Sequence, residues 1–401
     1  MDLKREITDL LIVSLEELIK IGSKNTFWGT TRANSDAILA LTTCLPEYDY
    51  YKLKSKCIQK ISKDSNELNG LVNWDEEIWD TSISIMALSS DLANNKVKIL
   101  NALNWIESKY IKHCQSWNEE LWETLLALNA IAFSRNKSIN SYEKNNYFEG
   151  SIKWINHFYN TPQTGVLINW HDTAFYLLFI VNSEEINLEN NIKLTLESHL
   201  KSSCEAILQT DVDLYDSVLW TSEVWSNGLV LWALSEAKYG TFEESKMRSI
   251  INWFRENINK TDTPIEDRSF AIIGLYKYLE YLEIIEGKDN PIKIKENLKV
   301  KISKLINTRV NDFIPKPPFI DKHSHIDYYI LNLNKRYLNV LFILLLTFFL
   351  TYFSISNSNY KGDFYSWLSI IPILLGILTT IAQLTNFDIL PKKSKNKKNE
   401  E

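Results

Sequence analysis

The stretch Trp79-Asp80-Thr81-Ser82 decides the fold, because it opens an apolar segment and returns in altered form along the chain. The related stretches are Ser35-Asp36-Ala37, Trp122-Glu123-Thr124, His171-Asp172-Thr173, Trp225-Ser226-Asn227 and Glu266-Asp267-Arg268. Their central positions, 36, 80, 123, 172, 226 and 267, are 41 to 54 residues apart. A repeat of this length with helical content predicts stacked helical hairpins.

Each stretch opens an apolar-rich helix, and a more polar amphipathic helix precedes it. The expected apolar helices are 37–45, 81–92, 124–133, 173–181, 228–237 and 269–282, and the amphipathic ones are 7–19, 51–61, 97–110, 148–159, 192–208 and 245–257. Helices that are apolar all round alternate with helices that are apolar on one face. This alternation predicts an all-α fold, an (α/α)6 toroid of six inner and six outer helices.

Composition limits the classes of function. The formal charge of −6 argues against a nucleic-acid partner, which requires a basic face. The four cysteines are scattered and form no CxxC pair, so the sequence predicts neither a zinc knuckle nor a disulfide framework. Unpaired cysteines of this kind are typical of a reducing compartment.

Two apolar stretches near the C-terminus, 338–355 and 367–384, predict a transmembrane hairpin. The expected segments are a cytoplasmic toroid domain (1–286), a helix and Pro-containing linker (287–336), a first span (337–355), a short turn (356–365), a second span (366–385) and a basic tail (386–401). Basic residues precede the first span and follow the second. This distribution predicts that both termini lie in the cytoplasm and that the protein lies in the inner membrane. The alternative is a pair of buried helices in a soluble core.

The six Trp- and acid-containing stretches resemble the α/α toroid of squalene–hopene cyclases, class II terpene cyclases and protein prenyltransferase β subunits, over roughly residues 1–285. Six-hairpin glycosidases share this outline. The resemblance implies either an Asp-x-Asp-Asp acid or a zinc site. The nearest acid motif, Asp211-Val212-Asp213-Leu214, lacks its last aspartate. His171 lies where a zinc ligand is expected, but the chain has no Asp-x-Cys pair. We therefore predict no cofactor, while Mg²⁺ and Zn²⁺ stay open.

The candidate site residues lie at the starts of the inner helices. The candidate ligand-binding residues are Asp36, Trp79, Asp80, Trp122, Glu123, Trp170, Asp172, Trp225 and Asp267, and the weak catalytic candidates are Asp172, Asp211, Asp213 and His171. Acids in a first helical turn also complement the free N–H groups and the helix dipole, without any further function. The functional alternative is a ring around one mouth of the barrel that binds a ligand or donates a proton.

The leading hypothesis is a membrane-anchored protein whose cytoplasmic toroid binds a small molecule, lipid or peptide and acts at the membrane. The layout of a sensor domain joined to two spans resembles that of bacterial antiviral defence effectors. A membrane-tethered isoprenoid cyclase or transferase, a glycan-acting barrel and a structural tether or partner-binding scaffold are the alternatives. Membrane lipid is an expected partner. Two short spans form a channel only as an oligomer, so a homo-oligomer is a further expectation.

Overall fold

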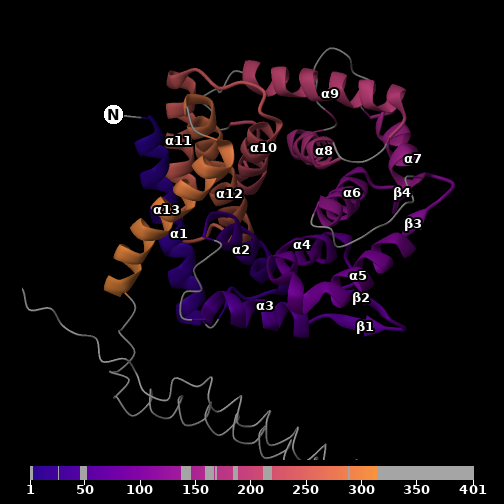
Figure 1. Ribbon diagram of the computed structural model, residues 1–401, viewed down its shortest axis with the longest axis horizontal. Helices are drawn as coiled ribbons and strands as arrows, with labels where there is room; N and C mark the ends of the chain where they lie inside the picture. Colours follow the sequence, from indigo (N-terminus) through magenta and orange to yellow (C-terminus); the bar gives the residue numbers. More distant parts are fainter. Residues whose placement is uncertain are drawn as a thin grey trace, which may run out of the picture. The chain divides into compact units, whose positions relative to one another are not determined.

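The computed structural model describes residues 3–25, 27–45, 52–136, 146–158, 167, 169–183, 188–210, 219–287 and 290–313. These residues all lie in the first of two units, which covers residues 1–314. The described part is predominantly helical (Figure 1), so the prediction of an all-α fold is confirmed. No helix within it is long and apolar enough to cross a membrane. The predicted spans, Asp211 and Asp213 lie outside the described residues.

Six helices contact one another in succession, and we call them the ring helices. They are α2 (Thr31–Cys44), α4 (Ile78–Leu88), α6 (Leu121–Asn136), α8 (Trp170–Asn182), α10 (Val224–Ala237) and α12 (Ile265–Glu286). Contacts run from α2 through α4, α6, α8 and α10 to α12, and α12 packs against α2 again (Figure 1). These contacts therefore form a closed circuit.

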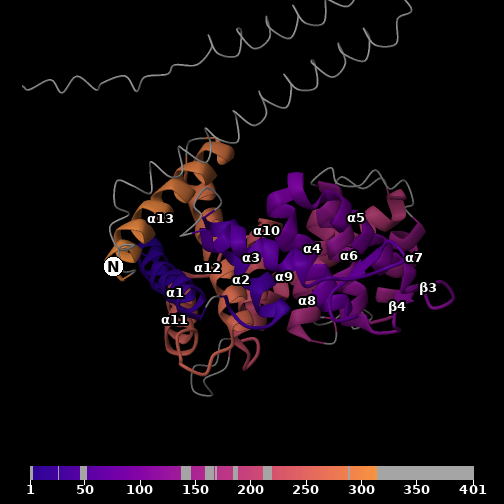
Figure 2. The same ribbon diagram turned by 90° about the horizontal axis from the view of Figure 1, so that it is seen from below.

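Other helices lie outside this circuit. They are α1 (Leu3–Asn25), α3 (Leu53–Lys63), α5 (Leu92–Ser108), α7 (Asn146–Ile155), α9 (Asn190–Gln209) and α11 (Glu244–Asn257). Helix α3 contacts α2 and α4, α5 contacts α4 and α6, and α9 contacts α8 and α10, so an outer helix bridges two ring helices in each case. Helix α1 packs against α12 and α11 (Figure 2).

Helix α13 (Pro291–Phe313) follows the ring helices and packs against α1, α12 and α2. Within the segment 287–336, expected to hold a helix and a linker, the proline at position 291 predicts a helix start, and the helix was expected to cover 291–306. The observed helix is seven residues longer, and it belongs to the same unit as the ring.

Burial separates the two sets of helices. Every residue of α4 is buried except Asp80, because neighbouring helices cover this ring helix on all sides. Helix α11 instead buries Met247, Ile250, Ile251, Trp253 and Phe254, which is the spacing of one helix face. Burial of apolar side chains on one face explains why the outer helices are amphipathic in sequence.

Buried tryptophans tie three outer helices to the ring. The indole N–H groups of Trp28, Trp74 and Trp117 each donate to a backbone carbonyl at 2.8 Å. The acceptors are Leu18 of α1, Ile61 of α3 and Ile106 of α5, respectively. Each tryptophan fills apolar space and satisfies its N–H group at the same time, as buried tryptophans usually do.

The fourth residue of each ring helix holds the loop that precedes the helix. In α4, the hydroxyl of Thr81 accepts a hydrogen bond from the backbone N–H of Trp74 at 3.1 Å. Equivalent bonds run from the backbone N–H groups of Trp28 to Asn34, Trp117 to Thr124, Leu167 to Thr173 and Thr221 to Asn227, at 2.9 to 3.1 Å. In α12, Arg268 donates to the backbone carbonyls of Thr263 and Lys260 instead. The repeated sequence therefore encodes a repeated loop attachment.

The ring helices begin earlier than the sequence predicted. The expected starts at Thr81, Thr124 and Thr173 are the fourth helical residues of α4, α6 and α8. Acidic residues at the third position belong to the first helical turn, where carboxylates are favoured by the helix dipole. The prediction placed these residues before the helix rather than within it, which is the usual error at a helix end.

Two short antiparallel hairpins precede α4 and α6, and the sequence did not predict them. Strands β1 (Asn66–Leu68) and β2 (Leu71–Asn73) form the first, and strands β3 (Tyr110–Ile111) and β4 (Ser116–Trp117) form the second. The expected helix over 97–110 therefore ends at Ser108, and Tyr110 belongs to a strand. Strands of two or three residues carry too little periodicity to be recognised.

Helices α10 and α12 approach each other most closely at two glycines. A Cβ atom on Gly228 would lie 2.5 Å from the backbone nitrogen of Ala271, and one on Gly274 would collide with the carbonyl oxygen of Gly228. Because both neighbours are backbone atoms, they cannot move aside as a side chain would. This contact fixes the separation of the two helices.

We expect Gly274→Ala to lower the free energy of unfolding by about 1–3 kcal/mol, because the added methyl group forces the two backbones apart. Urea denaturation followed by circular dichroism would measure the change. Gly150→Ala in α7 is the matched control, since its Cβ would meet only side-chain atoms of Tyr110 and Gln115, at 3.0 Å or more. Equal stability of the two variants would contradict the proposed backbone contact.

Candidate functional site

Aromatic side chains meet across the ring at the N-terminal ends of its helices. The Trp79 ring lies 5.7 Å from that of Trp122 and 5.5 Å from that of Trp225, measured between ring centroids. Phe175 packs edge-on against Trp79 at 5.8 Å. Trp79 belongs to α4 and Trp225 to α10, which are not successive ring helices, so the contact crosses the ring. We call Trp79, Trp122, Phe175 and Trp225 the aromatic seal.

Arg32 occupies the same second helical position in α2 that Trp79 occupies in α4. Its guanidinium carbon lies 4.0 Å above the Trp79 ring, a distance at which a cation is attracted to the aromatic face. Its Nε atom is also 4.0 Å from Oδ2 of Asp36. Arg32 therefore connects the aromatic seal to an acidic residue.

Asp36 lies deeper in the ring than the other predicted acids. It is the sixth residue of α2, whereas Asp80, Glu123, Asp172 and Asp267 are the third residues of their helices. The residue of α2 equivalent to Asp80 is Ala33, so the sequence alignment of Asp36 with the other acids was wrong by one helical turn. Asp36 is only 1% exposed, and neither carboxylate oxygen has a hydrogen-bond partner among the described residues.

Burial favours the protonated form of these acids. It raises the pKa of Asp36 well above the ordinary value of 3.8, although the Arg32 guanidinium opposes the rise. Burial also raises the pKa values of Asp80, Asp172 and Asp267 to about 6. Asp80 of α4 and Asp267 of α12 both raise the pKa of Asp36 by charge repulsion, so each of these carboxyls lies close enough to α2 to act on Asp36.

His171 and Asp172 are neighbours at the start of α8. The His171 Nε2 atom is 3.7 Å from Oδ1 of Asp172, and the imidazole packs against the Trp225 ring at 5.1 Å. Burial lowers the pKa of His171 and therefore favours its neutral form. Asn169 caps the helix by accepting the backbone N–H of Asp172 at 2.8 Å. The arrangement pairs a neutral imidazole with a carboxyl that ionises near pH 6.

The remaining predicted residues have local partners. The Glu123 carboxylate accepts a hydrogen bond from the side-chain amide of Asn118, and burial raises its pKa. Trp170 is the first residue of α8 and is half-buried against the core. The structure thus brings Trp79, Trp122, Trp225 and His171 together, while Glu123 and Trp170 are anchored at the starts of their own helices.

The aromatic seal lies at the end of the ring where the sequence predicted an open mouth surrounded by acids. Trp79 is only 8% exposed although it lies at the end of a helix. Asp172 is buried as well, whereas Asp80 and Asp267 at the same ends are partly exposed.

A cavity of about 420 Å³ lies at the opposite, C-terminal ends, and all six ring helices line it. Its apolar wall consists of Leu39, Met86, Phe133, Leu178 and Trp232. Its charged residues are Lys54, Glu236, Lys277, Glu280 and Lys299. The volume is within the range of small-molecule sites, about 300–1,000 Å³. The sequence does not indicate this cavity, because its residues follow no motif and come from separate helices.

Lys277 organises the charges of the cavity. Its Nζ atom lies 2.7 Å from a carboxylate oxygen of Glu236 and 3.2 Å from one of Glu280. Lys295 of α13 lies 3.5 Å from the same oxygen of Glu280. Burial alone would lower the pKa of Lys277, but the two carboxylates outweigh it and raise that pKa. Lys277 is therefore charged at neutral pH and is neutralised by its own neighbours.

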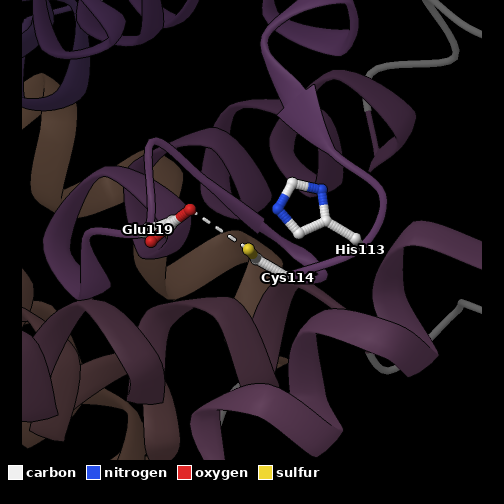
Figure 3. A group of neighbouring side chains, drawn as sticks. All are labelled: His113, Cys114 and Glu119. Atoms are coloured by element: carbon white, nitrogen blue, oxygen red, sulfur yellow. Dashed lines mark hydrogen bonds between the residues drawn. The ribbon is translucent and has the colours of Figure 1, made fainter.

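A third group lies away from the ring centre, on the turn between β3 and β4 and the residues after it. Figure 3 shows His113, Cys114 and Glu119 directed toward one another. The Cys114 thiol donates a hydrogen bond to Glu119 Oε1 at 3.2 Å, which raises the pKa of that thiol. Sequence analysis missed the group, although the adjacent residues His113 and Cys114 were a visible signal.

Comparisons with known proteins assign no family to the chain. None of the protein-family models matches the sequence. A search among curated proteins also gives no match. The functional argument therefore rests on the geometry of the two ends of the ring.

We expect Asp36→Asn to stabilise the protein at pH 7.5 and to have much less effect at pH 4. Because the folded-state pKa is raised, the folded state holds a proton that the unfolded state loses above about pH 4, so stability falls as the pH rises. Asparagine has no carboxyl proton to lose on unfolding, so the stability of the variant does not fall with pH in this way. The gain in the free energy of unfolding should therefore grow as the pH rises from 4 to 7.5.

Thermal unfolding of both proteins at several pH values would measure this difference. Asp75→Asn is the control, since Asp75 is exposed just before α4. This substitution should change the unfolding temperature by a similar, small amount at both pH values. A loss of stability at pH 7.5 would show that the ionised Asp36 carboxylate contributes favourable contacts.

Proposed function

We propose that the chain is a ligand-binding (α/α)6 toroid held at a membrane by its C-terminal hairpin. The closed circuit of ring helices, with outer helices that bridge successive ring members, supports this architecture. Five matching loop attachments, and a sixth at Arg268 in which the side chain donates instead, support six repeats, since each ring helix uses its fourth residue to hold the preceding loop.

The cavity at the C-terminal ends of the ring helices carries the proposal. It combines one apolar wall with a charged wall, which suits a small amphipathic molecule. The apolar wall would receive a short hydrocarbon or ring system. Because the aromatic seal occupies the other end, we expect such a ligand to enter from the charged end.

The charged end favours an anionic head group. Three lysines and two glutamates line the cavity, and the two glutamates are both paired with Lys277. Lys277 and Lys295 together balance the two glutamates, so Lys299 of α13 adds positive charge that a ligand would meet. Lysines near helix C-termini also offset the partial negative charge of the last carbonyl groups.

The membrane part of the proposal rests on the sequence. Two apolar stretches with basic flanks follow α13, and α13 contributes Lys299 to the cavity. A ligand in the cavity would thus contact the helix that leads toward the hairpin. This connection favours a role in which binding is reported at the membrane, as a sensor or effector requires.

We expect decanoate to raise the unfolding temperature of the protein, because a ligand that binds only the folded state stabilises it. Decyltrimethylammonium, with the same chain length and opposite charge, should give a much smaller shift. Differential scanning fluorimetry at submicellar concentrations would measure both. Equal shifts for the two probes would contradict an anionic preference.

Two variants test where the probe binds. Thr43→Trp adds bulk to the cavity wall and should abolish the decanoate shift, and Lys299→Glu should weaken binding at least about tenfold, roughly the loss of one charge-assisted contact. Lys293→Glu on the same helix is exposed and is the charge-matched control. Unchanged binding by Thr43→Trp would place decanoate elsewhere.

We expect the full chain to fractionate with membranes and to resist carbonate extraction, because two spans hold it in the bilayer. A chain that ends at residue 314, the limit of the first unit, should be released to the soluble fraction. Immunoblotting of cell fractions would measure this. Membrane retention of the shortened chain would contradict anchoring by the hairpin.

A further inference from the structure

The β3–β4 hairpin fixes two potential metal ligands beside each other. Its turn is closed by hydrogen bonds from the backbone N–H groups of Cys114 and Gln115 to the carbonyl of Ile111, at 3.2 and 2.8 Å. Gln115 adopts a left-handed conformation, with φ of 60°. His113 and Cys114 are thereby held on a short, closed turn rather than on a long loop.

Glu119, the third potential ligand, is positioned by the hydrogen bonds that fix Trp117. Trp117 is fixed by its indole bond to Ile106 and by the bond from its backbone N–H to Thr124. Asn118 and Glu119 follow in left-handed conformations, with φ of 52° and 60°, which turn the chain back toward the hairpin. The carboxylate of Glu119 then faces the thiol of Cys114 (Figure 3).

The ligand atoms are close enough for one ion. A ring nitrogen of His113, the sulfur of Cys114 and a carboxylate oxygen of Glu119 all lie within 4.8 Å of one another. His113 and Glu119 are exposed and Cys114 is half-buried, so an ion reaches them from solvent. The three other cysteines, Cys44, Cys57 and Cys204, are buried and do not compete.

The β1–β2 hairpin provides an internal comparison. It is followed by the same pair of left-handed residues, Asp75 and Glu76, with φ of 54° and 59°. Its turn, however, contains only Asn69 and Gly70 between the paired strands, whereas the β3–β4 turn contains residues 112–115. The longer second turn carries two potential ligands, His113 and Cys114, which the first turn lacks. A glutamate follows both hairpins.

We propose that His113, Cys114 and Glu119 bind a divalent transition metal ion of the zinc class. Thiolate, imidazole and carboxylate together suit Zn²⁺, whereas Mg²⁺ and Ca²⁺ require oxygen ligands only. On binding, the Cys114 thiol releases its proton to solvent and the sulfur takes the place of a metal-bound water. Three protein ligands leave a fourth tetrahedral position for water or for an external group.

Cobalt substitution tests this site without reference to any activity. The full-length chain, purified metal-free with its thiols reduced, is titrated with Co²⁺ and followed by absorption spectroscopy. We expect a thiolate-to-cobalt charge-transfer band and tetrahedral visible bands that saturate at one ion per chain. Addition of Zn²⁺ should remove both sets of bands.

Variants locate the ligands. Cys114→Ser should abolish the charge-transfer band, and His113→Ala and Glu119→Gln should each weaken Co²⁺ binding at least about tenfold. The matched controls are His157→Ala, Glu120→Gln and Cys57→Ser, which should bind like the parent protein. Circular dichroism of each variant confirms that it folds. The site is disproved if the parent protein gives no charge-transfer band, or if the band survives Cys114→Ser.

Discussion

The attachment of each ring helix to the loop before it is the constraint on which the rest of the structure depends. A side chain at the fourth helical position accepts or donates a hydrogen bond to loop backbone, and three buried tryptophans tie the same loops to outer helices. A buried backbone group left without a partner would cost about 1–3 kcal/mol. The loops are therefore fixed at the N-terminal ends. Side chains at the second helical position, Arg32, Trp79, Trp122, His171 and Trp225, contact one another there.

The two ends of the ring consequently differ in chemistry. At the N-terminal end, large aromatic rings pack together, and burial raises the pKa of nearby carboxyl groups such as that of Asp80. At the C-terminal end there is a cavity, and Lys277 lies between the carboxylates of Glu236 and Glu280. One set of helices thus provides an aromatic end and a charged, hollow end.

The sequence predicted the all-α class because the repeated stretches recur with the period of a helical hairpin. It also identified Trp79, Trp122 and Trp225 as members of one group. It misaligned Asp36 because an acid one turn into a helix looks the same in sequence as an acid at the start. It missed Lys277 and the cavity because residues that line a cavity from six helices share no local pattern. His113, Cys114 and Glu119 were missed because a short hairpin gives a weak signal.

The aromatic seal has a consequence for exchange kinetics. A channel allows a solute to enter at one end and leave at the other, whereas a cup requires both steps at the same rim. A ring in which the contact of Trp79 with the opposite helix closes one end would behave as a cup. The residence time of a bound molecule would then depend on the rim at the C-terminal ends, where the lysine side chains of α3 and α13 stand.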